Sequence, residues 1–340
     1  VRGVLTIYDD SDETFLGTKR GLEYAQALID IKPEMDKGCP SGGMSYLVQT
    51  RSNEMTRELV ENLARAGVRH LTFGVENASA FVRDSLRKRQ DDQQLLDLID
   101  WCVEFKVTPY YLMILFPPES RVEDVETNVR VVAEWIRRGA VVSAEPYLMP
   151  YRGTPLLDDP RYTYEHISFD VPYSGTPGKK LKWPTLVWPR DPAVRGILLA
   201  YRATLDDAIR RAREAAGHGH TMKGFTGRIC IEHLGRILDL FKRGIVKPWS
   251  GESSDDAAKV GAVYQEYFGQ ESGAAIRDMT RATIDGSMQS PTGRFNPSHA
   301  TLDHGANGSA NTNAVADLKQ GASKLRAQKD PAAPGEVILE

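Results

Sequence analysis

Charged and amide side chains follow the apolar segments in the first half of this chain. Carboxylates, guanidinium groups and amides bind the charged ends of small molecules through charge-assisted hydrogen bonds. Taken singly, each of these residues is also what an ordinary solvated loop contains, so their chemistry depends on the fold bringing them together. The residues at these positions are Asp9, Asp10, Arg51, Glu76, Asn77, Glu119 and the turn from Tyr151 to Thr154.

The elements that position these residues alternate between strand and helix. Between the apolar strand segments lie helical patterns, such as Val125, Val129, Val132 and Ile136 at spacings of four, three and four. This alternation predicts parallel βαβ units with right-handed crossovers and helices on the outside. Ligands of such folds bind at the carboxyl ends of the strands, where the polar residues lie. The predicted strands span residues 4–8, 45–50, 70–75, 107–116 and 141–149.

The alternation of strand and helix stops after Leu156. Residues 157–190 are rich in Pro, Tyr and Asp without a clear period, which predicts an irregular connection or lid. Residues 192–216 and 226–246 have amphipathic patterns that predict two appended helices. The last ninety residues are poor in apolar side chains and predict disorder, apart from a short helix near 257–268. The predicted domains are a partial barrel (1–156), a lid with a helical region (157–250) and a mostly disordered tail (251–340).

The composition is that of a globular protein outside the membrane. Of the 340 residues 41% are hydrophobic and 26% are charged, and no apolar segment approaches the length of a membrane span. A net charge of -3 gives no reason to expect nucleic acid or an anionic membrane as a partner. Cys39, Cys102 and Cys230 are far apart and odd in number, which favours a reducing compartment. We therefore expect a cytoplasmic protein.

Residues from about 3 to 156 resemble the radical SAM superfamily, particularly the branch whose members carry a cobalamin-binding domain. The most specific part is SYLVQTRSNEMTRELVENLARAGVRHLTFGVENAS, which is similar to the third barrel strand, its helix and the fourth strand. In that segment Glu76 stands in a turn that resembles GxES. The implied fold is a partial TIM-like (β/α) barrel that lacks its first unit.

Two further segments resemble the family with departures. YYLMILFPPES is similar to the fifth-strand pattern G-x-I-x-G-x-x-E and retains Ile114 and Glu119. Leu112 and Phe116 replace its glycines, which puts the ordinary adenine position in question. MPYRGTPL is similar to the sixth-strand PGTPL turn, with Arg152 in place of the usual proline.

The resemblance implies roles for individual residues in binding S-adenosyl-L-methionine (SAM). Asp10 would approach the amino group of the methionine moiety, and Lys88, in the basic segment SLRKRQ, would approach its carboxylate. We expect Asp10, Glu76 and Lys88 to point into a common opening. The full predicted set of cofactor-binding residues is Asp9, Asp10, Arg51, Glu76, Lys88, Ile114, Glu119 and Tyr151.

The implied cofactors are SAM and a [4Fe-4S] cluster, and whether cobalamin binds is left open. The superfamily holds its cluster on a CxxxCxxC loop, and no two cysteines of this chain have that spacing. We therefore expect the cluster ligands upstream of Val1, no metal ligand in these residues, and a fragment that is inactive alone.

The resulting interpretation is the catalytic core of a radical SAM enzyme, which cleaves SAM reductively to a 5'-deoxyadenosyl radical. Cobalamin-dependent methyl transfer and radical rearrangement are alternative outcomes, with a small-molecule substrate and a reductant such as ferredoxin or flavodoxin as partners. A second interpretation is a non-catalytic barrel remnant that binds a nucleotide or a partner. An ordinary phosphate-binding barrel is disfavoured because no glycine-rich phosphate loop precedes a helix.

Overall fold

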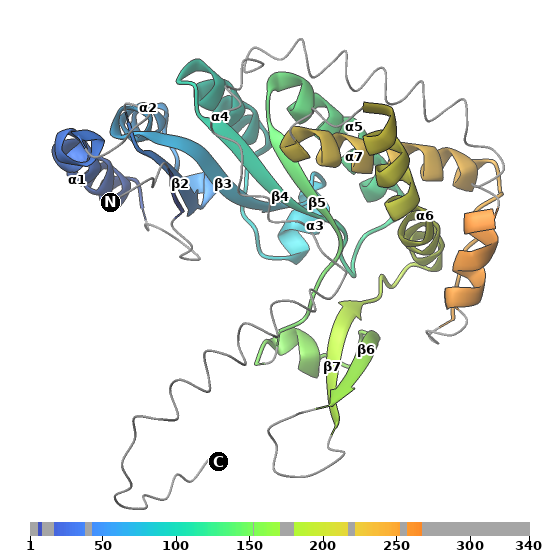
Figure 1. The fold of residues 1–340 in the computed structure, drawn as a ribbon. Helices are drawn as coiled ribbons and strands as arrows, with labels where there is room; N and C mark the ends of the chain where they lie inside the picture. Colours follow the sequence, from blue (N-terminus) through green and yellow to red (C-terminus); the bar gives the residue numbers. More distant parts are fainter. Residues whose placement is uncertain are drawn as a thin grey trace, which may run out of the picture. The chain divides into compact units, whose positions relative to one another are not determined.

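Five parallel strands form a single sheet in the order β1-β2-β3-β4-β5 (Figure 1). The computed structural model describes residues 6–8, 17–37, 43–151, 153–170, 180–216, 222–251 and 257–266. The predicted α/β class with a partial barrel of parallel strands is confirmed. The strands are β1 (Thr6–Tyr8), β2 (Ser45–Thr50), β3 (Val68–Glu76), β4 (Thr108–Phe116) and β5 (Val141–Tyr147).

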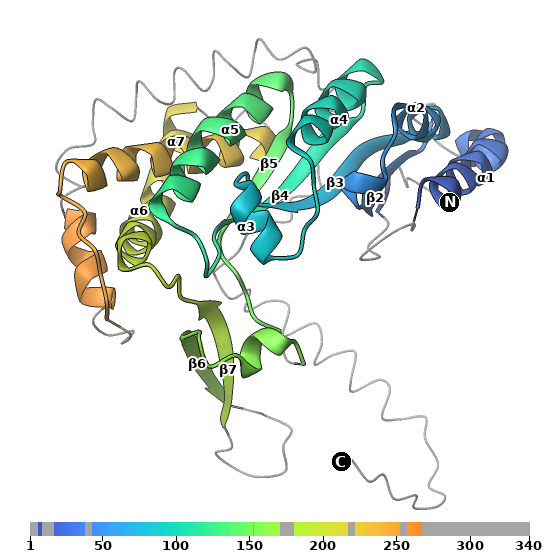
Figure 2. The same cartoon turned by 180° about the vertical axis from the view of Figure 1, so that it is seen from behind.

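Helices between the strands cover one face of this sheet, and Figure 2 shows α4 and α5 in front of the strands that they cover. Capping residues set their ends: the Thr56 side chain accepts a hydrogen bond from the Leu59 amide at the start of α2, and Gly67 ends it with a φ of 106°. The helices are α1 (Thr18–Lys37), α2 (Arg57–Ala66), α3 (Ala80–Ser85), α4 (Asp92–Glu104) and α5 (Val122–Arg138), with a 3-10 turn, η1, at Ser52–Glu54.

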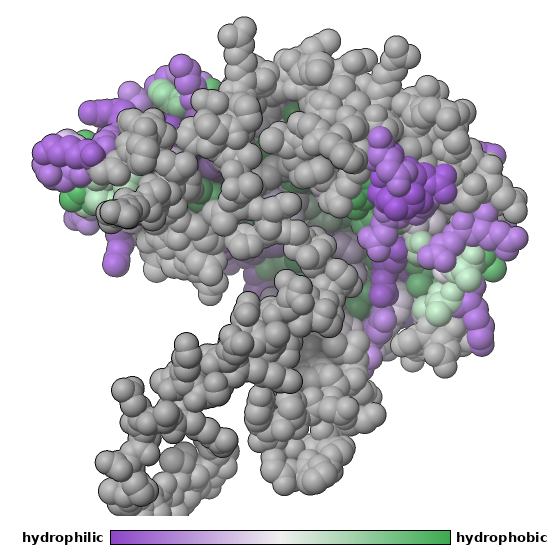
Figure 3. Space-filling view, in the orientation of Figure 1, coloured by the Kyte–Doolittle hydropathy of each residue, from purple (hydrophilic) through white to green (hydrophobic). Residues whose placement is uncertain are grey.

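The helix α1 differs from the others because it is mostly exposed, with Gly21 and Ala25 as its buried residues. It packs mainly against α2, and hydrophilic side chains gather over it in Figure 3.

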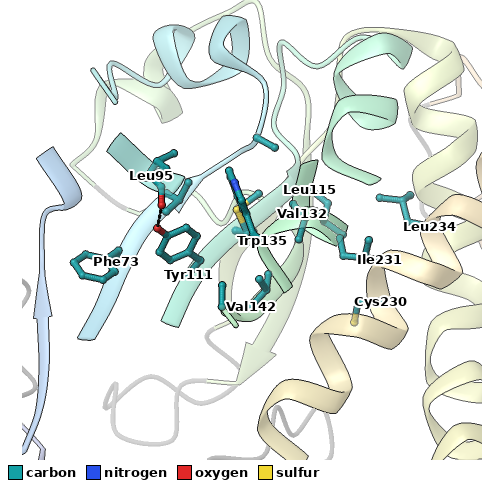
Figure 4. Packing of buried hydrophobic residues seen from close by; sticks show 14 of the residues in the cluster. Phe73, Leu95, Tyr111, Leu115, Val132, Trp135, Val142, Cys230, Ile231 and Leu234 are labelled. Atoms are coloured by element: carbon teal, nitrogen blue, oxygen red, sulfur yellow. Dashed lines mark hydrogen bonds between the residues drawn. The ribbon is translucent and has the colours of Figure 1, made fainter. Parts of the chain in front are cut away.

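Alternate residues of β4 point into a core between the sheet and the helices. Tyr111 is fully buried there, and its hydroxyl donates to the Leu95 carbonyl over 2.6 Å (Figure 4). Its ring stands edge-on to Phe73 and Trp135, with centroids 5.9 and 5.3 Å apart. The polar tip of this tyrosine is therefore satisfied within an apolar core.

The opposite face of the sheet carries the residues that alternate with these buried ones along each strand. They are small, polar or half-buried. On β4 this set includes Leu112 and Ile114, and Gly74 of β3 pairs in register with Leu112. The exposed Glu145 of β5 pairs in register with Ile114. Among the described residues this face is therefore less deeply buried than the helix-covered face.

The region predicted to be an irregular connection or lid contains an antiparallel hairpin, so the expected lack of regular structure was wrong, and a role as a lid stays a prediction. Its strands are β6 (Tyr164–Asp170) and β7 (Lys180–Val187), preceded by a 3-10 turn, η2 (Pro155–Asp158). Pro184 lies within β7 and pairs with His166 of β6. The pairing register shifts just before this pair, between Glu165 and His166. The proline and this irregularity break the two-residue period that would have identified the strands.

Two long helices follow the hairpin, α6 (Pro192–Ala216) and α7 (Met222–Lys242). The predicted bounds of α6 are confirmed, whereas α7 lies four residues earlier than predicted and is followed by Gly244 with a φ of 73°. Both helices share one hydrophobic core with the sheet, and Figure 4 shows Ile231 of α7 near Leu115 of β4 and Val132 of α5.

The contact between α7 and β5 is unusually close at one point. Gly227 of α7 lies so near the Val142 carbonyl oxygen that a methyl group there would overlap it. Glycine in a helix interior costs about 1 kcal/mol relative to alanine, so its presence here is explained by this close approach.

The predicted short helix near 257–268 is present as residues 257–266, while the rest of the predicted disordered tail lies outside the described residues. Trp188 is buried and its ring centroid lies 5.1 Å from that of Trp249, so it serves packing. None of the described helices is both long and apolar enough to cross a membrane.

A buried histidine lies between α6 and α7. The Thr204 hydroxyl donates to the Ala200 carbonyl and lies 2.8 Å from His233 Nε2, so this nitrogen is assigned as the donor of a neutral ring. Burial, with a smaller contribution from Arg236, lowers the pKa of His233 to about 4, and Asp207 acts in the opposite direction. The ring of Tyr201 lies 5.7 Å away, and charge on His233 is therefore disfavoured in the folded protein.

We expect acid to destabilise the protein through His233. The pKa of His233 in the folded protein is below its unfolded value of about 6.5, so protonation favours the unfolded chain. The contribution of the neutral ring to the free energy of unfolding is therefore complete above pH 6.5 and is lost as the pH falls toward 4. Between pH 7 and pH 5 this amounts to about 2 kcal/mol of unfolding free energy, measurable by urea denaturation. His233→Gln should reduce this pH dependence, and His166→Gln, at an exposed site, should keep it. Equal pH dependence in wild type and His233→Gln would contradict the assignment.

Candidate cofactor-binding site

The carboxyl end of β3 departs from regular strand geometry. The register with β4 shifts between Gly74 and Glu76, and Glu76 has a φ of 68°, in the left-handed region that residues with side chains seldom adopt. The Asn77 amide then donates to the Val75 carbonyl over 2.9 Å. Such strain persists only where the surroundings hold it, and it is common at binding sites.

The loop that follows is held by buried amide and hydroxyl groups. Asn77 is fully buried, and its side-chain amide donates a hydrogen bond to the Ile114 carbonyl over 2.9 Å. Asn128 of α5 accepts from the Ala78 amide over 2.9 Å and donates to the Leu115 carbonyl. The end of β3 is thereby fixed to the end of β4.

Asp124 of α5 anchors the same loop. The Ser79 hydroxyl donates to its carboxylate over 2.6 Å, and Arg121 donates from both its backbone and side chain. Burial acts to raise the pKa of Asp124, but the hydrogen bonds from Arg121 and Ser79 outweigh it and leave the pKa below its usual value. Asp124 therefore stays ionised and keeps the loop in place.

At this edge Glu76 and Lys88 form an ion pair, with Nζ 2.8 Å from Oε1. Their side chains are 19% and 41% exposed, so the pair is open to solvent on one side. Gly74 lies beneath it: a Cβ at this position would stand 2.7 Å from Glu76 Oε1 and 3.4 Å from Lys88 Nζ. The absence of a side chain at Gly74 thus makes room for both charges.

Glu119, also in the predicted set, belongs to a different group of contacts. It accepts a hydrogen bond from the Tyr162 hydroxyl over 2.8 Å and forms an ion pair with Arg190 at 3.1 Å. Burial, followed by the hydrogen bond to Glu119, raises the pKa of Tyr162 to about 12. Glu119 therefore links the β4–α5 loop to the segments on either side of the hairpin.

The other predicted residues take varied positions. Arg51 is exposed after β2, Ile114 contributes its carbonyl to Asn77, and Tyr151 is 64% exposed after β5. Asp9 and Asp10 lie outside the described residues, so the common opening expected for Asp10, Glu76 and Lys88 stays a prediction.

Two residues that shape this edge escaped the sequence reasoning. Gly74 gave no signal because an isolated glycine in a strand has many causes. Arg83 resembled a surface cation of an amphipathic helix, but its side chain is 1% exposed. A buried arginine in a helix of six residues is recognisable only in three dimensions.

Comparison with known proteins agrees with the predicted resemblance. Residues 11–131 match the family model of the radical SAM superfamily. No curated protein matches the chain.

Solved structures similar to this chain include three enzymes. The radical S-adenosylmethionine methyltransferase TsrM from Kitasatospora setae, with cobalamin and a [4Fe-4S] cluster bound, is 14% identical, with 72% of this chain and 53% of that chain covered and a TM-score of 0.47. The cobalamin-dependent S-adenosylmethionine radical enzyme OxsB, with aqua-cobalamin and S-adenosylmethionine bound, is 11% identical, with coverages of 83% and 51% and a TM-score of 0.47. Coproporphyrinogen III oxidase (HemN) from Escherichia coli is 14% identical, with coverages of 42% and 32% and a TM-score of 0.32.

This chain spans about half the length of TsrM and OxsB. The family match includes the end of β3 and the segment that carries Lys88. The predicted resemblance to the radical SAM superfamily is therefore confirmed, and residues 11–131 are the segment that carries it.

Proposed function

We propose that this chain is part of a radical SAM enzyme and that the carboxyl end of β3 binds the amino acid end of SAM. Superfamily members use SAM with a [4Fe-4S] cluster, which supplies reductive cleavage of SAM when bound. The observation that carries the proposal is the solvent-open pair of Glu76 and Lys88 within the matching segment.

The charges of this pair fit the ligand. The amino acid end of SAM has one ammonium and one carboxylate group, and Glu76 and Lys88 offer one partner for each. Because both side chains are partly exposed, they can exchange their mutual contact for contacts with the ligand without a buried charge being left alone. Gly74 adds no side chain that would block this exchange.

The described cysteines do not fit the cluster. Cluster ligation requires thiolates, and burial raises the pKa of Cys102 far above its ordinary value and that of Cys230 to about 11. Cys39 lies outside the described residues. Among the described residues no group of three or more His, Cys, Asp or Glu side chains could hold a metal. The role proposed for the described residues is therefore to bind and orient SAM.

Two reaction classes agree with this role, cobalamin-dependent methyl transfer and radical rearrangement of a small-molecule substrate with electrons from a ferredoxin or flavodoxin. A SAM-binding module without catalysis is the second candidate function. This candidate shares the pair of Glu76 and Lys88 with the first one and would bind SAM without a cluster.

We expect Glu76→Gln and Lys88→Ala each to weaken SAM binding about tenfold, because each removes one charge-assisted contact worth roughly 1.5–3 kcal/mol. Equilibrium dialysis of the full chain with radiolabelled SAM measures the effect. Decarboxylated SAM, which lacks the carboxylate, should bind wild type and Lys88→Ala equally.

Arg89→Ala is the matched control, since it removes one positive charge from an exposed position in the same segment. It should leave SAM affinity within about twofold of wild type. If Arg89→Ala weakened binding as much as Lys88→Ala, a general basic surface would explain the data and the assigned role of Lys88 would be wrong.

A further inference from the structure

We propose that Arg83 is the positioning residue that holds Glu76 and Lys88 in register for SAM, an inference that rests on the proposed function. Its guanidinium lies between the two loops that carry these residues. It does not touch the ligand in this scheme, and acts through the backbone on both sides.

The contacts of Arg83 run to both loops. On one side Nη1 donates to the carbonyls of Asn77 and Ala78, over 3.1 and 2.8 Å, directly after Glu76. On the other side Nη2 donates to the Gln90 carbonyl over 3.4 Å, two residues beyond Lys88, and to the carboxylate of Asp92.

The backbone of Arg83 contributes as well. Its carbonyl accepts a hydrogen bond from the Lys88 amide over 2.8 Å, in the turn that ends α3. Arg87 in that turn has a φ of 58°. Lys88 therefore follows a residue with a left-handed backbone, and Glu76 has such a backbone itself. Both strained conformations need contacts from outside the two loops to hold them.

Gln90 adds a second connection between the same loops. Its side-chain amide donates to the Gly74 carbonyl and to the Ser52 hydroxyl, each over 2.9 Å. The segment after Lys88 is thereby tied to the strand that ends in Glu76, in agreement with the bridge made by Arg83.

The burial of Arg83 favours positioning over stabilisation. Its side chain is 1% exposed, whereas that of its partner Asp92 is 69% exposed, and among the described residues Arg83 Nε has no hydrogen-bond partner. A buried ion pair is by itself weak evidence for a stabilising role. A planar guanidinium can bridge two loops at once, which the single nitrogen of a lysine cannot do with the same geometry.

The test is a double-mutant cycle on SAM affinity in the full chain. Arg83→Lys keeps the charge and should weaken SAM binding about tenfold, whereas Arg89→Lys, the same change at the exposed neighbour, should leave it unchanged. In the Lys88→Ala background, Arg83→Lys should cost less than it does in the otherwise wild-type chain, about threefold, because one of the two residues that it positions is already absent.

Outcomes distinguish this inference from the proposed function. If Glu76→Gln and Lys88→Ala leave SAM binding unchanged, the proposed function fails. If they weaken binding and Arg83→Lys does not, or if Arg83→Lys weakens it equally in the Lys88→Ala background, the positioning role fails alone. Arg83→Met removes every donor and should lose more affinity than Arg83→Lys; should it not fold, Arg83→Lys, checked by its thermal transition, still decides.

Discussion

Gly227→Ala should lower the free energy of unfolding by about 3 kcal/mol, because the added methyl group meets the Val142 carbonyl and not a movable side chain. The helix α7 has to move away from β5 to relieve this overlap, and the core between them opens. Urea denaturation followed by circular dichroism measures the loss.

Gly235→Ala is the matched control on the same helix. A Cβ there would stand 3.3 Å from the Val129 Cγ1 methyl, which a small side-chain adjustment can accommodate. The helix propensity of alanine is better by about 1 kcal/mol, so this variant should be within about 1 kcal/mol of wild type. If both variants lost the same stability, the close approach at Gly227 would not be the cause.

The second large effect concerns affinity. Gly74→Val should weaken SAM binding about a hundredfold, since its side chain occupies the space of both the Glu76 carboxylate and the Lys88 ammonium. The free energy of unfolding should stay the same or rise, because valine favours strands and glycine does not. Equilibrium dialysis and urea denaturation of the same preparation separate the two quantities.

Thr72→Val provides the control two residues earlier on β3. It places the same side chain on the same strand at a nearly fully buried position, and SAM affinity should be unchanged. A hundredfold loss in Thr72→Val, or a Gly74→Val protein that binds SAM normally, would contradict the site at the end of β3.

Most of the fold could be predicted from the regular spacing of apolar residues along the sequence. The strand predicted at 107–116 and the helix at 192–216 agree closely with β4 and α6, because burial on one face imposes a pattern on the sequence. The hairpin was missed because Pro184 and the irregular register of β6 and β7 remove that pattern.

The candidate site was predictable in its parts but not in its contacts. Glu76 and Lys88 could be named from their places after a strand and in a basic segment, but the ion pair between them depends on a left-handed backbone at Glu76. The contact between Glu119 and Arg190 spans 71 residues, and local sequence holds no trace of it.

The close packing of α7 on β5 also bears on how the chain is made. Among the described strands β5 lies at one end of the sheet, with β4 as its neighbour, and strands at the end of a sheet invite pairing with other chains. At about 5–20 residues per second, a ribosome releases α7 on the order of ten seconds after β5. Until then β5 lacks the helix α7 that packs against it in the folded protein. Gly227 is the point at which α7 comes close to the backbone of β5.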